Sequence, residues 1–261
     1  MPRRPVFPVP TLSEQDGVRH LHLGTPWIQG SMRIARPNDI ELEYVQRMMA
    51  WMLLLPEAAW RGGTAVQLGL GAAAVTKFLR KRLRMRCVAV EINPAVILAA
   101  HRWFALPAPD DRLQVLCADA GAFAADAAHA GMAAVLHVDM YDQDAAAPVF
   151  ESAEFYANCR NLLAAHGAMV VNLFSGPGHT RVLERNLQRI VRAFDQPGDS
   201  VWMLPPNRDG NLIAFALRDA AQSALPTSAQ LLERADDVAA RTGGLPARRW
   251  ARLLKRLSPP R

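Results

Sequence analysis

Short apolar runs alternate with longer amphipathic stretches through the middle of the chain. The apolar runs are five or six residues long and cover residues 64–69, 87–91, 113–118, 135–139 and 168–173. Between them lie segments such as residues 73–83, whose Ala, Leu, Lys and Arg content predicts a helix. Near-continuous apolar strands separated by helices indicate a parallel sheet with helices on both faces.

Two further apolar runs, residues 201–204 and 212–217, close this alternation. Only residues 205–211 separate them, which is too short for a crossover helix, so we expect these two strands to be antiparallel. The predicted fold class is therefore α/β, a methyltransferase-type Rossmann-like doubly wound sheet with an antiparallel last strand.

The first 58 residues have a different pattern. Residues 19–24 and 27–34 predict a short β-hairpin around a Gly24-Thr25-Pro26 turn, and residues 39–55 predict a helix with an apolar face. We divide the chain into this hairpin and helix appendage (1–58), a Rossmann-like domain (59–218), and C-terminal helices with a basic tail (219–261).

The positive charge of the chain belongs to its C-terminal tail. The net charge is +6, and residues 246–261 contain six basic residues and no acid, so the rest of the chain is balanced. We interpret the tail as a solvated helix that packs by one apolar face; contact with nucleic acid or an anionic membrane is the alternative. We expect neither a membrane nor a nucleic-acid partner.

Three cysteines, Cys87, Cys117 and Cys159, lie far apart and form no C-x-x-C motif. They predict no structural disulfide and favour a reducing, cytoplasmic compartment. No apolar run approaches the ~20 residues that a membrane-spanning helix needs, and the N-terminus has no secretory signal pattern.

Polar residues that suit a nucleoside end three successive strands. Gly69-Leu70-Gly71 follows the first strand, where glycine lets the backbone approach a ligand. Glu91 ends the second strand and can accept hydrogen bonds from ribose hydroxyls. Asp119 ends the third strand, where it can accept from an adenine amino group. Each acid alone could be a helix cap, but together they predict a nucleoside site at the carboxyl edge of the sheet.

An acidic cluster follows the fourth strand, with carboxylates at Asp139, Asp142 and Asp144. Negative charge beside a nucleoside would attract a cationic amine, and a carboxylate that faces an ammonium can act as a general base. A solvated acidic loop is the alternative. His20 and His22 share one face of a predicted strand, but no third ligand has suitable spacing, so we predict no metal site.

These residues resemble the spermidine synthases, or polyamine aminopropyltransferases, over roughly residues 21–217. The matching segments are Ile28-Gln29, Tyr44, Gly69-Leu70-Gly71, Val90-Glu91-Ile92-Asn93, Ala118-Asp119-Ala120, Val138-Asp139-Met140-Tyr141-Asp142 and Phe150-Glu151-Ser152-Ala153-Glu154-Phe155-Tyr156. The last segment is similar to the family's L-F-T-x-E-F-Y, which ordinary methyltransferases lack.

The resemblance implies that decarboxylated S-adenosylmethionine is the co-substrate. Gly69 and Gly71 would approach it, Glu91 would hold its ribose and Asp119 would lie near its adenine. Gln29 would lie near the nucleoside or the sulfonium.

The resemblance also implies an aminopropyltransferase that acts on a polyamine substrate. Tyr44 would lie near the amine acceptor, such as putrescine, and Asp142 would anchor the ammonium of the acceptor. Asp139 would be the general base, and 5′-methylthioadenosine would leave. A homodimer is expected from the family and from the Met- and Trp-rich residues 48–60.

The chain departs from the family pattern at several positions. The Gly-loop aspartate that would hold the aminopropyl ammonium is Ala72, and the family's D-[ST]-[ST]-D-P ends here in Gln143 instead of proline. The loop after the sixth strand, residues 205–209, has no aromatic residue and carries Arg208. Two alternatives therefore stay open, a methyltransferase that uses intact S-adenosylmethionine and a non-catalytic spermidine synthase-like protein.

Overall fold

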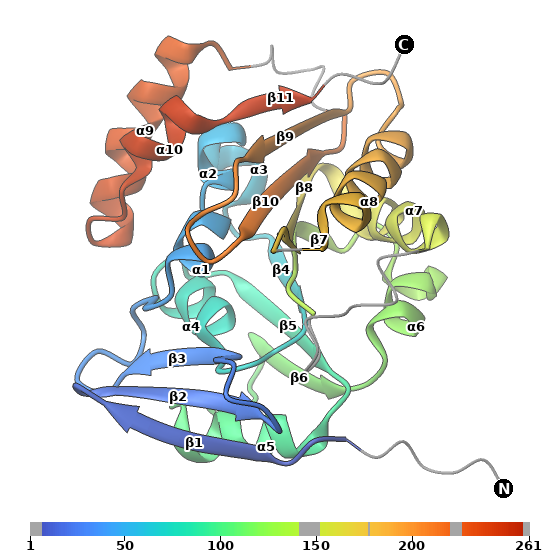
Figure 1. Cartoon of the computed structure of the whole chain (residues 1–261). Helices are drawn as coiled ribbons and strands as arrows, with labels where there is room; N and C mark the ends of the chain where they lie inside the picture. Colours follow the sequence, from blue (N-terminus) through green and yellow to red (C-terminus); the bar gives the residue numbers. More distant parts are fainter. Residues whose placement is uncertain (1–6, 141–151, 177, 220–225, 258–261) are drawn as a thin grey trace, which may run out of the picture.

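A mixed sheet of eight strands forms the centre of the computed structural model, which describes residues 7–140, 152–176, 178–219 and 226–257 (Figure 1). The strand order is β11-β9-β10-β8-β7-β4-β5-β6. The strands are β4 (Thr64–Leu68), β5 (Arg86–Glu91), β6 (Leu113–Cys117), β7 (Ala133–Val138), β8 (Leu163–Phe174), β9 (Ser200–Leu204), β10 (Asn211–Leu217) and β11 (Lys255–Leu257).

The sheet confirms the predicted topology. Strands β4 to β8 pair in parallel, whereas β10 is antiparallel to both β8 and β9. The prediction missed β11, which pairs antiparallel with β9 and forms one edge of the sheet. Its three residues, Lys-Arg-Leu, have no apolar pattern to mark them as a strand. Charged side chains on an edge strand discourage pairing with other chains.

Helices cover both faces of the sheet because side chains alternate along each strand. Val66 and Leu68 of β4 belong to one apolar cluster with Phe155, and Ala65 belongs to another with Trp51. The helices that follow the parallel strands are α4 (Ala74–Lys81), α5 (Pro94–Trp103), α6 (Ala120–Ala125), a 3₁₀ turn (Ala127–His129), α7 (Ala153–Leu162) and α8 (Thr180–Ala193).

The N-terminal region is a three-stranded antiparallel sheet, β1 (Pro10–Gln15), β2 (Val18–Leu23) and β3 (Gly30–Arg33). The predicted hairpin exists as the β2–β3 pair, but its second strand begins at Gly30 rather than at residue 27. Strand β1 was missed because its Pro-Thr-Leu-Ser-Glu-Gln sequence is mostly exposed and polar. This small sheet lies beside α4 and α5 (Figure 1).

The single helix predicted over residues 39–55 is wrong. The segment forms two short helices, α1 (Glu43–Met48) and α2 (Trp51–Leu54), followed by α3 (Glu57–Trp60). Every residue from Val45 to Leu55 except Gln46 is buried, so no single helix face carries the apolar residues. Because residues 48–55 are buried inside the chain, any dimer must use another surface.

The C-terminal segment forms α9 (Ser228–Thr242) and α10 (Ala247–Leu253), with α9 packed against α2 and α10. Ala247, Trp250 and Ala251 are buried, while Arg248 faces outward and pairs with Asp236 at 2.6 Å. The predicted helix that packs by one apolar face is therefore present as α10, whereas Lys255–Leu257 form strand β11 instead of continuing the helix. One apolar cluster contains residues from all three predicted units, whose division stays a prediction. None of the helices in the described ranges has the length and apolarity needed to cross a membrane.

Candidate active site

The Gly69-Leu70-Gly71 loop joins β4 to α4 and requires glycine at both ends. Gly69 has φ +85° and Gly71 has φ +51°, in the left-handed region that favours glycine. A Cβ atom at Gly69 would overlap the carbonyl oxygen of Asp139. The loop therefore lies directly against the end of β7, as a ligand-approaching turn at this edge of the sheet should.

The Glu91 carboxylate ties this loop to the end of β5. It accepts a hydrogen bond from Leu70 N at 3.0 Å and another from Asn93 N at 2.9 Å. A carboxylate has about four lone-pair positions, so these two bonds leave room for ribose hydroxyls. The backbone bonds thus orient a half-buried acid at the position predicted for the ribose.

Asp119 follows β6 and is exposed. Its Oδ1 accepts from Ala122 N at 2.7 Å, so it caps the N-terminus of α6. The helix-cap interpretation is therefore correct for this residue. Capping uses one carboxylate oxygen, and Asp119 lies at the same edge of the sheet as Glu91, one strand away.

Asp139 follows β7, the strand beside β4, and is half-buried. Its Oδ2 accepts from the Tyr44 hydroxyl at 3.1 Å, and its Oδ1 accepts from Asn172 Nδ2 at 2.9 Å. Desolvation raises the pKa of Asp139, and the hydrogen bonds from Asn172 and Tyr44 lower it in part. The structure therefore brings Tyr44 and Asp139 together, although 95 positions separate them in the sequence.

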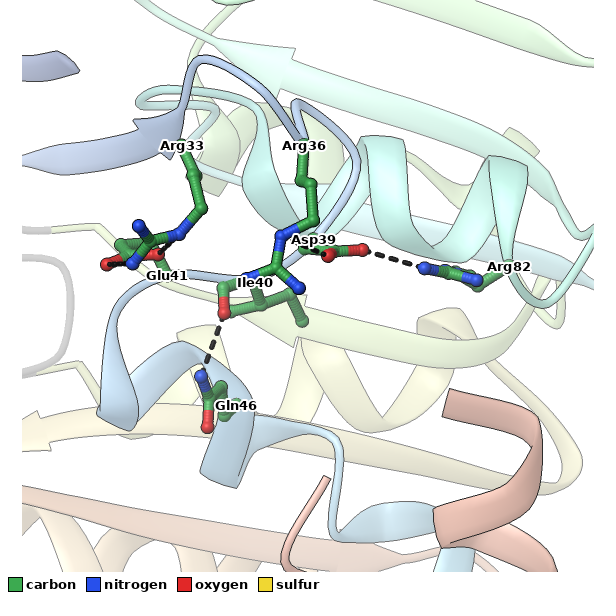
Figure 2. Close-up of polar contacts among 7 residues, drawn as sticks. All are labelled: Arg33, Arg36, Asp39, Ile40, Glu41, Gln46 and Arg82. Carbon is green, nitrogen blue, oxygen red and sulfur yellow. Dashed lines mark hydrogen bonds and ion pairs between the residues drawn. The ribbon is translucent and has the colours of Figure 1, made fainter. Parts of the chain in front are cut away.

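Ion pairs hold the segment that leads from β3 to α1, the helix that carries Tyr44. Arg33 donates to both oxygens of Glu41, at 3.1 Å from Nε and 2.7 Å from Nη2. Asp39 pairs with Arg82 at the end of α4 at 2.7 Å (Figure 2). Figure 2 shows these contacts on the loop that leads into α1. Exposed pairs contribute ~0–1 kcal/mol each, so we assign them a role in the path of the loop rather than in overall stability.

Part of the predicted site lies outside the described residues. This holds for Asp142, Asp144 and the Phe150-Glu151 pair, while Ser152 caps α7 by accepting from Phe155 N at 3.2 Å. In the ranges that the structure describes, no three potential ligands converge on a metal site. His20 contacts Ser31 Oγ at 2.8 Å.

Comparison with known proteins finds relatives over most of the chain. No protein-family model matches it. A polyamine aminopropyltransferase of Neisseria meningitidis is 29% identical over 221 residues, which make up 83% of this chain and 79% of that protein. A polyamine aminopropyltransferase of Chromobacterium violaceum is 29% identical over 240 residues, which make up 91% of this chain and 86% of that protein.

The chain is similar to the polyamine aminopropyltransferases over most of its length and has diverged from them. Solved structures agree on the fold. A probable spermidine synthase from Corynebacterium glutamicum has a TM-score of 0.70 at 18% identity, covering 93% of this chain and 90% of its own. Human methyltransferase-like protein 13 in complex with SAH has a TM-score of 0.65 at 20% identity, covering 81% and 93%. The predicted Rossmann-like fold class is therefore confirmed.

The position that corresponds to the Gly-loop acid of the spermidine synthases is filled here by a core residue. Ala72 is 3% exposed and belongs to an apolar cluster with Leu21 and Met32. A Cβ atom placed on Gly30 would lie 2.6 Å from Ala72 Cβ. The small N-terminal sheet thus packs directly on this position, which carries no charge for a donor ammonium.

Gln29 lies beside the Gly loop, and its place near the nucleoside or the sulfonium stays a prediction. Its backbone N–H donates to Leu21 O at 2.8 Å, and a Cβ atom at Gly71 would lie 3.1 Å from its carbonyl oxygen. The backbone of Gln29 therefore forms one wall of the loop, next to the predicted nucleoside site.

Sequence reasoning missed two asparagines of the site. Asn172 on β8 donates to Asp139, and its Oδ1 accepts from Asn211 Nδ2 at 3.1 Å at the start of β10. Asn172 interrupts the apolar run of β8, Met-Val-Val-Asn-Leu-Phe, and is 2% exposed. A polar residue inside a strand predicted to be buried was the available signal, because such a residue needs a hydrogen-bond partner.

Proposed function

We propose that this chain is a transferase that moves an aminopropyl group from decarboxylated S-adenosylmethionine to an amine such as putrescine, releasing 5′-methylthioadenosine. Two relatives named polyamine aminopropyltransferases support it over most of their own length. The observation that carries the proposal is the half-buried Asp139, whose carboxylate is held by Tyr44 and Asn172 and whose backbone carbonyl lies against the Gly loop.

The donor would lie across the carboxyl ends of β4, β5 and β6. Gly69 and Gly71 let the backbone approach it, and Glu91 is oriented to accept from the ribose hydroxyls. Asp119 lies one strand further, beside the expected adenine position. The two relatives and the arrangement of acids at successive strand ends support this placement.

The reaction needs a base next to the point of attack. The lone pair of the acceptor nitrogen attacks the carbon next to the sulfonium, the C–S bond breaks, and its electron pair stays on sulfur as the thioether. The proton that the amine loses goes to Asp139. Desolvation raises the pKa of Asp139, which makes its carboxylate a better proton acceptor than an exposed aspartate.

We expect Ala72 to weaken binding of the donor without changing the reaction. One lost charged hydrogen bond is worth about 1.5–3 kcal/mol, so we expect a higher KM for the donor than a carboxylate at this position would give. The fold is shared with a methyltransferase, but the two relatives that span most of this chain favour aminopropyl transfer.

The test is methylthioadenosine release from purified protein given decarboxylated S-adenosylmethionine and putrescine. We expect product from the wild type and a loss of at least about 100-fold in Asp139→Asn, as general-base removal gives. Circular dichroism of the variant checks that it folds. Binding of the donor without product formation would keep decarboxylated S-adenosylmethionine as the donor and rule out putrescine as the acceptor. Absence of donor binding, with binding of intact S-adenosylmethionine, would overturn the proposal.

We further propose a cytoplasmic homodimer. Cys87, Cys117 and Cys159 are all free thiols, which suits a reducing compartment. Sedimentation velocity over a range of protein concentrations tests the dimer, and a monomer at every concentration would refute it.

A further inference from the structure

A chain of side-chain amides leads away from Asp139 across two strands. Asn172 Nδ2 donates to Asp139 Oδ1 at 2.9 Å, and Asn172 Oδ1 accepts from Asn211 Nδ2 at 3.1 Å. Asn211 N in turn donates to Asn207 Oδ1 at 2.9 Å, in the loop between β9 and β10. Asn172 is 2% exposed, so its amide cannot rely on bulk water for partners.

The direction of these bonds matters because an amide has one end that donates and one that accepts. Turning the Asn172 amide by half a turn would present its oxygen to the Asp139 carboxylate, which is repulsive. Asn211 opposes that turn, since its own Nδ2 needs the Asn172 oxygen as acceptor. The amide of Asn172 is thereby fixed with its N–H group towards Asp139.

We propose that Asn211 and Asn172 are positioning residues, in which Asn211 sets the orientation of the Asn172 amide and Asn172 holds Asp139 as an ionised proton acceptor. The inference rests on the role proposed above for Asp139. Hydrogen bonds donated to a carboxylate favour its charged form. The N–H group of Asn172 and the hydroxyl of Tyr44 both donate to Asp139, on different oxygens.

Among the described residues, few titratable groups lie near Asp139. Tyr44 contacts its carboxylate, and a tyrosine hydroxyl in water ionises near pH 10. His137 lies two residues earlier on β7, is fully buried, and has a pKa lowered to about 3 by desolvation. Asp209, in the loop that Asn207 joins, is exposed and donates its backbone N–H to Asn207 Oδ1 at 3.1 Å. Within the described ranges, Asp139 is therefore the group at this position expected to titrate between these limits.

Two substitutions of Asn211 separate orientation from simple loss of a contact. In Asn211→Ala, the Asn172 oxygen loses its donor, and the amide keeps some preference for Asp139. In Asn211→Asp, a carboxylate of nearly the same shape accepts from Asn172 Nδ2 and turns the amide, so its oxygen faces Asp139. The new carboxylate would also raise the pKa of Asp139 by repulsion whichever way the amide points. A rise of that pKa in the uncharged Asn211→Ala is therefore the result that tests orientation, and Asn211→Asp should show the larger rise.

The experiment measures the Asp139 carboxyl directly and the reaction separately. Carbon-13 NMR titration of aspartate-labelled protein, with Asp139→Asn for assignment, should show the pKa of Asp139 raised in Asn172→Ala and raised further in Asn211→Asp than in Asn211→Ala. The acidic limb of kcat/KM for methylthioadenosine release should move to higher pH in the same order. At neutral pH we expect kcat/KM to fall roughly 10- to 100-fold in Asn211→Asp, with partial recovery at higher pH.

The matched control is Asn161→Asp on the exposed surface of α7, which makes the same chemical change away from the site. Thermal unfolding shows which variants fold, and the half-exposed position of Asn211 keeps the test available if Asn172→Ala does not. An unchanged Asp139 titration in Asn211→Ala, or a larger effect there than in Asn211→Asp, would overturn the inference. If the titration of Asp139 shifts as expected but Asp139→Asn keeps its activity, the role of Asp139 as general base is refuted. The inferred orientation of the Asn172 amide would then still stand.

Discussion

A buried lysine makes the free energy of unfolding of this chain increase with pH in the alkaline range. Lys77 lies on α4, just after the Gly loop, and is 1% exposed. Its Nζ donates to Phe104 O at 2.6 Å, and in the part of the chain that the structure describes no carboxylate pairs with it. Desolvation lowers its pKa from 10.5 to about 8, because the interior solvates the ammonium less well than water does.

The size of the effect follows from linkage. Below pH 8 both folded and unfolded chains carry the proton, and the folded state bears the full desolvation penalty. As pH rises from about 8 to 10.5 the folded state loses its proton first, so the free energy of unfolding increases. The whole difference corresponds to about 3 kcal/mol, of which about 2.5 kcal/mol falls between pH 7 and pH 10.

The substitution Lys77→Met removes this titration while keeping a long, unbranched side chain. Urea unfolding of wild type and variant at pH 7, 8, 9 and 10 gives the difference in unfolding free energy, from which groups common to both proteins cancel. We expect the wild type to gain about 2.5 kcal/mol on the variant across this range. Lys81→Met is the control, because Lys81 is exposed on the same helix. Wild-type and Lys77→Met curves that run parallel across the range would refute the reasoning.

Two further predictions concern the Gly loop and a buried ion pair. Gly69→Ala should cost about 1–3 kcal/mol more than Gly17→Ala in urea unfolding, because both residues have positive φ but only the Cβ at Gly69 meets another backbone atom. Equal losses would contradict this. Asp199→Asn should cost about 3 kcal/mol, because the fully buried Asp199 side chain pairs with Arg160 Nε at 2.6 Å; a thermal midpoint equal to that of wild type would show that the pair adds little.

Local patterns were enough to predict the parallel part of the sheet and the strand ends at which the candidate donor residues stand. Apolar strands five or six residues long, separated by helices, have few ways to bury their surface, and each of the donor residues stands at a strand end. Gly69 and Glu91 could therefore be placed from the sequence, because parallel strands put their carboxyl ends at one edge. The helix of the basic tail followed the same logic, because Ala247, Trp250 and Ala251 share one buried helix face.

Contacts between distant segments had to come from the tertiary structure. Tyr44 and Asp139 meet only because α1 packs across β8 and β10, and no spacing in the chain records that approach. The breaks between α1, α2 and α3 reflect burial on every side, which a one-face pattern cannot predict.

The sequence by itself determined which chemical groups this protein contains and which strand ends carry them. Strand periodicity and turn residues are local patterns that can be recognised over a few positions. Only the tertiary structure decided that Ala72 faces a packed sheet and that Asn172 turns its N–H group to Asp139. Hydrogen-bond direction and burial depend on every neighbour in space, and most of those neighbours are remote in the chain.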